Sequence, residues 1–176
     1  MQETPDDLAA LQALLDASWA AGGPHLRSII TADRRVGAEA LCRRLTGMCL
    51  LVLATVTADG RPLAGPVDGI FYRGSWYFSS SPDSVRLRHI ARRPQVSATH
   101  LPEESFSVTV HGRAVPIDFR DPGQSGFRAC LLGIYGPRYG TGWEDWAAVN
   151  AAYWRIDAAK MFTFAMTEPA TLPDVS

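Results

Sequence analysis

The chain is 176 residues long, a length typical of one domain with a substantial hydrophobic core. Hydrophobic residues make up 47% of it and charged residues 20%, and the formal net charge is −1, so the overall charge gives no indication of a nucleic acid or an anionic membrane as partner. The sequence has no run of roughly 18 apolar residues that could span a bilayer, and its acidic start differs from the basic start of a secretory signal.

The three cysteines bear on the cellular compartment and on metal binding. Cys42, Cys49 and Cys130 are an odd number and lack a CxxC spacing, which argues against a disulfide framework or a structural zinc site. Reduced thiols in a cytoplasmic protein are the preferred interpretation. The four histidines show no metal-ligand spacing, so no metal site is predicted.

Residues 1–47 are predicted to form a helical segment in front of the main domain. The TPDD sequence at residues 4–7 is typical of a helix start, because threonine caps a helix, proline suits its first turn and early acidic residues favour its dipole. Apolar residues then recur at helical spacing: Leu8, Leu11, Leu15 and Trp19. This stripe could pack on the chain's own barrel or on a dimer partner, and the sequence leaves both open. Residues 24–35 are expected to be a connector, and residues 36–47 a second helix that ends at Gly47.

The central part of the chain is predicted to run in the order strand, strand, strand, short helix, strand. Three β-type runs come first, at residues 50–58, 62–72 and 75–80. They are separated by Asp59-Gly60 and Arg73-Gly74, whose glycines suit tight hairpins. Residues 84–93 have helical character, and Pro94 ends this helix because proline disfavours the helical conformation in the residue before it. Residues 95–100 then resume an extended chain.

The remainder of the chain is predicted to complete a barrel. Residues 105–120 form a long half-buried strand in which Gly112 marks a bulge or a bend. Two helices and a closing strand follow, at residues 127–136, 144–154 and 158–166. Residues 167–176 are expected to be a flexible tail. Five or six mostly antiparallel strands result, and because closure removes exposed sheet edges, the pattern predicts a small antiparallel barrel with peripheral helices.

A hydroxyl-rich strand end followed by a helix start is the feature that points to a ligand. Residues 79–81 are three serines at the end of the third strand, and Ser84 and Arg86 follow at the helix start. Phosphate binds to hydroxyls, to free amides at helix N-termini and to guanidinium groups, and this junction could supply all three. Taken alone, the residues fit an ordinary polar turn better, in which Asp83 or Ser84 caps the helix.

Several segments carry a family resemblance through their combination and order. They are LLVLATVTADGRP, PLAGPVDGIFY, YFSSSPDSVRLRHIARRPQVSA, VHGRAVPID and RIDAAKMFTF. In the third segment, the serine-rich strand end, the Ser84-x-Arg86 step, Ile90 and Pro94 follow the family pattern. Residues 50–165, about two-thirds of the chain, thus resemble the pyridoxamine 5′-phosphate oxidase-like split-barrel flavoproteins. That group includes flavin-dependent oxidases and reductases, deazaflavin-dependent reductases and haem-binding proteins.

The resemblance implies a mainly β (α+β) fold, with a six-stranded antiparallel split β-barrel at residues 48–166 that binds FMN. It implies a homodimer with the cofactor at the subunit interface and a small-molecule substrate. The implied function is an FMN-dependent oxidoreductase that moves electrons between a reduced nicotinamide and a small organic acceptor or oxygen. The alternatives are a deazaflavin-dependent reductase, whose basic groove the arginine pairs at residues 34–35 and 43–44 could supply, and a non-catalytic flavin- or haem-binding protein.

The resemblance also implies which residues contact the cofactor. The second strand would carry the flavin along its backbone, where Gly65 leaves room for close approach. Asp68 departs from the family pattern, and it is either a polar contact to the flavin or substrate or a solvated or bulge residue. Trp143 would cover the flavin ring or pack in the core. The flavin carries the chemistry, so no catalytic residue is nominated. The predicted cofactor contacts are Gly65, Pro66, Val67, Asp68, Ser79, Ser80, Ser81, Ser84, Val85, Arg86 and Trp143.

Overall fold

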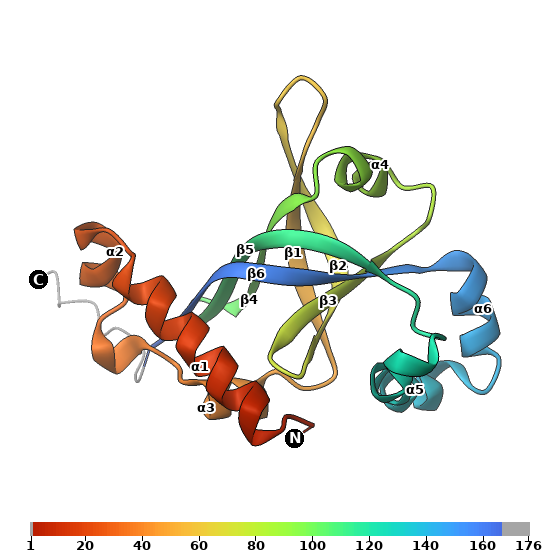
Figure 1. The fold of residues 1–176 in the computed structure, drawn as a ribbon, viewed down its shortest axis with the longest axis horizontal. Helices are drawn as coiled ribbons and strands as arrows, with labels where there is room; N and C mark the ends of the chain where they lie inside the picture. The colour runs from red at the N-terminus through yellow and green to blue at the C-terminus, as the bar shows by residue number, and fades with distance from the viewer. Residues whose placement is uncertain (1, 167–176) are drawn as a thin grey trace, which may run out of the picture.

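The computed structural model describes residues 2–166, so residue 1 and the tail predicted to be flexible, residues 167–176, lie outside the described residues. Six antiparallel strands close into a barrel (Figure 1), which confirms the mainly β (α+β) barrel expected from the sequence. The strands are β1 (Met48–Val56), β2 (Pro62–Tyr72), β3 (Ser75–Ser80), β4 (Gln95–Glu103), β5 (Phe106–Ile117) and β6 (Ala152–Ala165). They follow one another around the barrel in the order β1-β2-β3-β6-β5-β4.

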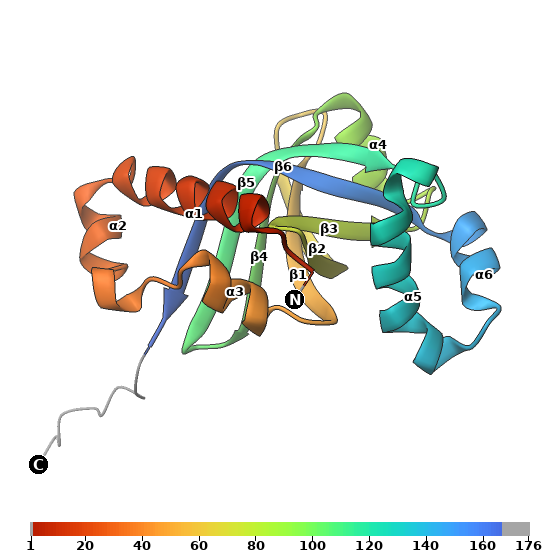
Figure 2. The same ribbon diagram turned by 60° about the horizontal axis from the view of Figure 1, so that its bottom comes forward.

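Helices cover the barrel from several directions (Figures 1 and 2). They are α1 (Pro5–Ala20), α2 (Pro24–Ile29), α3 (Ala38–Arg44), α4 (Val85–Arg92), α5 (Ser125–Tyr139) and α6 (Trp143–Asn150), with the short 3₁₀ helices η1 (Ala32–Arg34) and η2 (Pro122–Gln124). The first three lie on one side of the barrel and α5 and α6 on the opposite side, while α4 lies beside the β1–β2 hairpin. Within residues 2–166, no helix has the length and apolar character needed to cross a membrane.

The two predicted hairpins form as the sequence indicates. In the β2–β3 turn, Arg73 and Gly74 both have positive φ, at 49° and 75°. Positive φ at both central residues matches the twist of a tight two-residue hairpin. In the β1–β2 turn, Gly60 has a φ of 87°, which glycine adopts without steric cost.

The start of α1 is fixed by its cap and by an ion pair. The Thr4 hydroxyl accepts a hydrogen bond from the Asp7 N–H at 3.2 Å, and the Asp7 carboxylate accepts one from the Thr4 N–H at 2.9 Å. Arg73 donates to the same carboxylate at 2.8 Å, and this contact holds the pKa of Asp7 below its usual value. Leu11 and Leu15 join the barrel core, so α1 packs on its own barrel.

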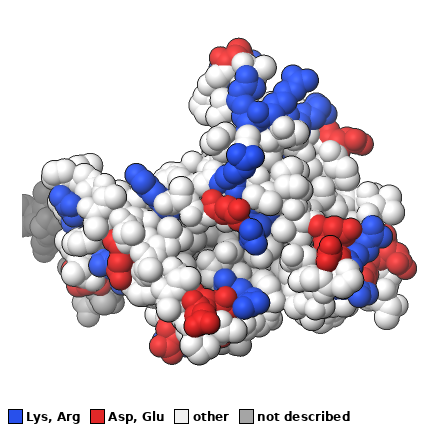
Figure 3. All heavy atoms as spheres, viewed as in Figure 1, with Lys and Arg blue, Asp and Glu red and all other residues white. Residues whose placement is uncertain are grey.

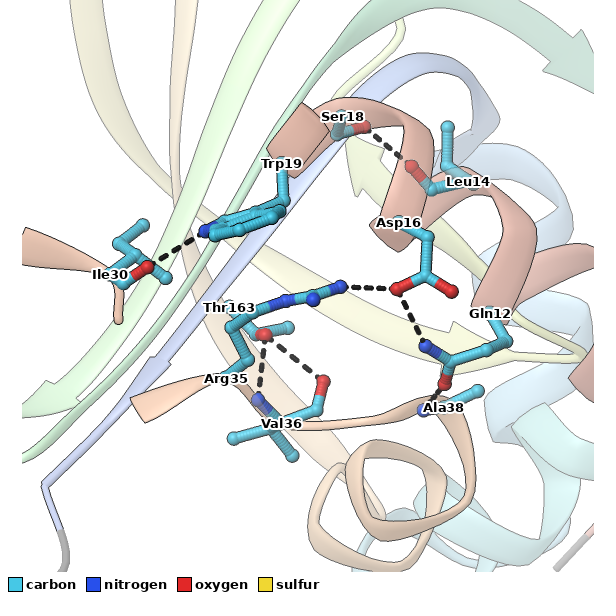
Figure 4. Close-up of polar contacts among 10 residues, drawn as sticks. All are labelled: Gln12, Leu14, Asp16, Ser18, Trp19, Ile30, Arg35, Val36, Ala38 and Thr163. Atoms are coloured by element: carbon cyan, nitrogen blue, oxygen red, sulfur yellow. Dashed lines mark hydrogen bonds and ion pairs between the residues drawn. The ribbon is translucent and has the colours of Figure 1, made fainter. Parts of the chain in front are cut away.

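Buried hydroxyls fasten the N-terminal segment to β6 (Figure 4). Ser18 donates a hydrogen bond to the Leu14 carbonyl at 2.6 Å and accepts one from the Met161 N–H at 2.9 Å. Thr163 donates to the Val36 carbonyl and accepts from the Val36 N–H, both at 3.0 Å. These contacts give hydrogen-bond partners to the Met161 N–H of β6 and to the N–H and C=O of Val36. The barrel strands do not pair with these backbone groups.

The predicted bulge in the long fifth strand is confirmed. The pairing of β5 with β6 shifts between His111 and Gly112. A Cβ atom on Gly112 would lie 2.2 Å from the carbonyl oxygen of Asp157, so a larger residue cannot occupy this position without moving β6.

Two parts of the sequence-based prediction are wrong. Residues 24–35 are not a plain connector, since they contain α2 and η1. The helix predicted at residues 144–154 ends at Asn150, and the closing strand begins at Ala152 rather than at residue 158. Tyr153 pairs with β3 on one side and with β5 on the other. This two-sided pairing outweighs the helical tendency of the local sequence.

We expect Ser18→Ala to destabilise the protein by about 1–3 kcal/mol, because it leaves the buried Met161 N–H without a partner. The free energy of unfolding from urea denaturation is the measurement. Ser28→Ala is the matched control, since that hydroxyl is exposed and bonds locally to the His25 carbonyl. Equal stability of the two variants would contradict a structural role for Ser18.

Candidate functional site

The site begins where β2 and β3 separate. β2 pairs with β1 throughout residues 62–70, but its pairing with β3 extends only from Gly69 to Tyr72. On its other edge β3 pairs with β6 from Trp76 to Ser80, so Ser79 and Ser80 have partners in β6 but none in β2. Residues 64–68 of β2 therefore form a strand edge that faces the end of β3 and the start of α4.

The backbone of this edge points toward α4. The Pro66 carbonyl accepts a hydrogen bond from Arg86 Nη1 at 2.7 Å, so it points away from β1. Because backbone groups alternate in direction along a strand, the N–H and C=O groups of Ala64 and Asp68 point the same way. Pro66 itself has no N–H. The edge thus offers backbone donors and acceptors to a bound molecule.

Hydroxyls connect the end of β3 with the start of α4. Ser84 caps α4, since its hydroxyl accepts a hydrogen bond from the Leu87 N–H at 3.4 Å. The Ser80 hydroxyl donates to the Ser84 hydroxyl at 3.0 Å. The polar-turn interpretation of this segment is thus right as far as the cap is concerned. The same geometry still gathers two hydroxyls and the free amides of a helix N-terminus in one place.

Arg86 lies in a small hollow between α4 and the β1–β2 sheet. The hollow has a volume of about 220 Å³, and Gly65, Val85, Arg86 and His89 are among its lining residues. A Cβ atom on Gly65 would lie 3.1 Å from Arg86 Nη2, so glycine leaves the guanidinium the room it occupies. His89 Nδ1 is 3.1 Å from the Thr55 hydroxyl, which ties α4 to β1. Arg86 is thus held against β2 rather than extended into solvent.

A larger cavity of about 560 Å³ lies on the other side of the strand end, between the barrel and α5 and α6. This volume lies within the range of roughly 300–1,000 Å³ that is usual for small-molecule sites. The barrel contributes Asp68, Ser79, Ser80, Ser81 and Tyr153, and the helical side contributes Tyr135, Tyr139, Trp143, Trp146 and Asn150. An ion pair between Arg128 of α5 and Glu144 of α6 holds the two helices together.

Asp68 and Tyr135 form the polar contact at the base of this cavity. The Tyr135 hydroxyl donates to Asp68 Oδ2 at 3.1 Å, and the Tyr135 ring stacks on Trp143 with 4.8 Å between centroids. Burial, with the negative charge of Asp68, raises the pKa of Tyr135 above its usual value. The same two causes, in the same order, raise the pKa of Tyr153 to about 12. Both phenols therefore remain protonated hydrogen-bond donors at neutral pH.

The structure brings the predicted contacts together in two neighbouring hollows. Asp68, Trp143 and the serines at residues 79–81 line the large cavity, and Gly65, Val85 and Arg86 line the small one. Ser84 joins the two through Ser80, and Pro66 contributes its carbonyl oxygen. The side chain of Val67 points into the barrel core, which leaves only its backbone for a ligand. Asn150 and the pairing of Asp68 with Tyr135 carried no signal in the sequence.

The arginine pairs of the N-terminal segment have other partners. Arg35 forms an ion pair with Asp16 of α1, and Arg43 with Glu39 of its own helix. Arg44 pairs with Glu103 of β4. These arginines lie on the N-terminal side of the barrel and are absent from the lining of both hollows, as far as the described residues show.

The barrel of this chain is closed, and its strands β2 and β3 separate beside a hydroxyl-rich strand end. This arrangement is that of the split-barrel proteins. The sequence profile of this class that bears the description "Pyridoxamine 5'-phosphate oxidase" matches residues 39–131, which is more than half of the chain. The chain belongs to this family. A search of curated proteins found no match.

Solved structures show the same fold at low sequence identity. A conserved hypothetical protein from Mycobacterium tuberculosis has a TM-score of 0.64 and 15% identity, with 82% of this chain and 98% of that chain covered. A FAD-binding protein from Mesorhizobium loti has a TM-score of 0.54 and 21% identity, covering 74% and 93%. HutZ, the haem storage protein of Vibrio cholerae, has a TM-score of 0.53 and 20% identity, covering 65% and 85%. These likenesses show that the fold is shared.

We expect the buried phenol of Tyr153 to make the protein sensitive to alkali. A tyrosine whose folded pKa lies above its ordinary value of 10.0 stabilises the fold fully below that value, and this contribution is lost as the pH rises toward about 12. Over this pH interval, the free energy of unfolding should therefore fall by about 2 kcal/mol less in Tyr153→Phe than in the wild type. Denaturant titrations at several pH values measure it, with exposed Tyr139→Phe as the control. Parallel losses in wild type and Tyr153→Phe would contradict the assignment.

Proposed function

We propose that the protein is an FMN-dependent oxidoreductase that moves electrons between a reduced nicotinamide and a small organic acceptor or oxygen. The observation that carries the proposal is the junction of β3 and α4. There the Ser80 and Ser84 hydroxyls lie at the N-terminus of α4, and Arg86 of the same helix donates to the open edge of β2. These groups are the donor set that a phosphate monoester requires.

The surface charge supports an anionic ligand at this place. Basic side chains gather over α4 and the neighbouring β1–β2 hairpin at the top of Figure 3. The sequence of α4 and the residue after it contributes Arg86, Arg88, Arg92 and Arg93, although the net charge of the whole chain is −1. Positive potential concentrated at one end of the molecule favours the approach of an anion to that end.

The residues that would hold the flavin are those of the strand edge and the two hollows. Ser84 and Arg86 would bind the phosphate, and the backbone of residues 64–68 would lie along the remainder of the molecule. Bound FMN supplies the hydride and electron transfer. The chain itself would orient the ligand through fixed backbone groups and exclude water with the aromatic wall of α5 and α6. Tyr135 and Tyr153, which stay protonated, would provide hydrogen-bond donors within the large cavity.

We further propose that the protein is a homodimer through the outer face of β1. Met48, Leu50 and Val52 occupy alternate positions and point outward, with Leu50 58% and Val52 51% exposed. Leu101 of β4, a strand that flanks β1, is exposed as well. A contiguous apolar patch on a sheet face favours association. In similar proteins the flavin lies at the subunit interface, and the small hollow with Arg86 opens between β1, β2 and α4.

Haem is the alternative cofactor, because a haem storage protein shares the fold. The lining of the large cavity argues against it, since none of the described residues there is a histidine. A deazaflavin has less support than FMN, because Arg35, Arg43 and Arg44 are engaged in ion pairs away from the site. An absorption spectrum of the purified protein separates the cofactors, since flavin bands favour FMN or FAD and a Soret band favours haem.

We expect Arg86→Ala to weaken FMN binding by about 10- to 100-fold, the usual effect of losing a hydrogen bond to a charged group. Riboflavin, which lacks the phosphate, should bind the variant and the wild type equally well. Quenching of flavin fluorescence gives both affinities. Arg88→Ala is the matched control, because that guanidinium bonds to the Asp83 carbonyl at 2.6 Å and not to β2. Unchanged FMN affinity in Arg86→Ala would remove the phosphate assignment.

We expect Leu50→Glu to convert a dimer into a monomer, because it places a charge in the centre of the exposed apolar face of β1. Light scattering coupled to size-exclusion chromatography measures the mass, and circular dichroism checks the fold. Ile29→Glu on α2 is the control, since Ile29 is exposed on a different side of the barrel. A monomeric wild type, or a dimeric Leu50→Glu variant, would overturn the proposed interface.

A further inference from the structure

The large cavity has a single charged residue type in its described lining. Among the described residues that line this cavity, Asp68 is the one acidic residue, and none is basic. Five aromatic side chains form most of the remaining wall: Tyr135, Tyr139, Trp143, Trp146 and Tyr153. A cavity with aromatic walls and a single carboxylate attracts positive charge and repels anions.

The carboxylate of Asp68 has unused acceptor capacity. Oδ2 accepts a hydrogen bond from the Tyr135 hydroxyl, and a carboxylate can accept several more. Among the described residues, Asp68 takes part in none of the ion pairs. Arg86 is directed to the Pro66 carbonyl, and Arg138 shares an adjoining hollow of about 710 Å³ with Asp68 without forming an ion pair with it. Within the described residues, the carboxylate is therefore not neutralised by an ion pair, and the lining of the large cavity contains no cationic side chain.

The aromatic wall consists of planar rings, which suit a flat molecule. Tyr135 and Trp143 are stacked with an angle of 15° between their planes, so each ring covers one face of the other. Trp146 is 59% exposed although it lines the same cavity, so one of its faces is free to cover an occupant. The faces of tyrosine and tryptophan rings carry partial negative charge, which favours a cation lying against them.

We propose that this cavity binds a planar organic cation without a phosphate group, such as an N-heteroaromatic cation or a protonated aromatic amine, with its positive nitrogen toward Asp68. The inference rests on the proposed function in that it names the substrate class of the same site. Phosphorylated substrates are disfavoured there, because the cavity offers them no cationic side chain and places a carboxylate in their way. Asp68 is then a specificity-determining residue rather than a solvated or bulge position.

The test is calorimetric titration of the purified full chain with three flat molecules of similar size: N-methylquinolinium, 2-naphthol and 2-naphthoate. We expect the cation to bind at least about tenfold more tightly than the neutral and anionic molecules. Asp68→Asn should abolish this preference while leaving the neutral molecule unaffected. Glu144→Gln is the matched control, since it also removes one carboxylate near the site but does not line the cavity. Its preference for the cation should equal that of the wild type.

The outcomes separate this inference from the proposed function. Equal binding of the three molecules by the wild type, or an unchanged preference in Asp68→Asn, overturns the inference whatever the protein does with FMN. FMN titration of the wild type and of Glu144→Gln reports on the proposed function alone, because Glu144 does not line the cavity, and we expect these two proteins to bind FMN equally well. If Asp68→Asn fails to fold, the wild type is titrated at low and at high salt instead. A preference for the cation that weakens with salt supports the inference, and one that does not weaken overturns it, because salt screens the attraction to a carboxylate but not stacking.

Discussion

The separation of β3 from β2 is the constraint on which the rest of the site depends. β3 pairs with β6 through to Ser80, but its pairing with β2 stops at Phe78, so residues 64–68 of β2 have no strand neighbour on that side. Unpaired backbone groups inside a folded protein need partners. Arg86 satisfies one of them by donating to the Pro66 carbonyl, which also fixes α4 over the gap. The strand edge, the helix start and the guanidinium thus lie together where β2 lacks β3 as a neighbour.

Helices on two opposite sides make this arrangement rigid. The barrel core includes Phe78 and is extended by leucines of α1 and α3, whereas Tyr77 belongs to a second core under α5 and α6. Successive residues of β3 point to opposite faces, so the strand is buried on both. The large cavity lies at the border of the second core, where Asp68 and the serines replace apolar residues. Its walls therefore belong to packed elements rather than to loops.

Sequence reasoning succeeded where the signal is local. The hairpins at Gly60 and Gly74, the bulge at Gly112 and the cap at Thr4 depend on residues that are close in the chain, and all are present. The start of β6 was missed because it is decided by pairing with strands far away in the sequence. The same holds for the site. The serines and Arg86 could be found from residue types, but the contact of Asp68 with Tyr135 joins residues 67 positions apart.

The strand edge of β2 has opposite charges at two points along its length. Arg86 is bound at Pro66, and Asp68 follows two residues later, roughly 7 Å further along a β-strand. A molecule lying on this edge would meet a guanidinium at one end and a carboxylate at the other. An anionic group can therefore be accommodated at the α4 end and an electron-poor or cationic ring at the α5 end, while the reverse orientation places like charges together. In the proposed flavin site, these two charges would favour one direction for the bound molecule over the other.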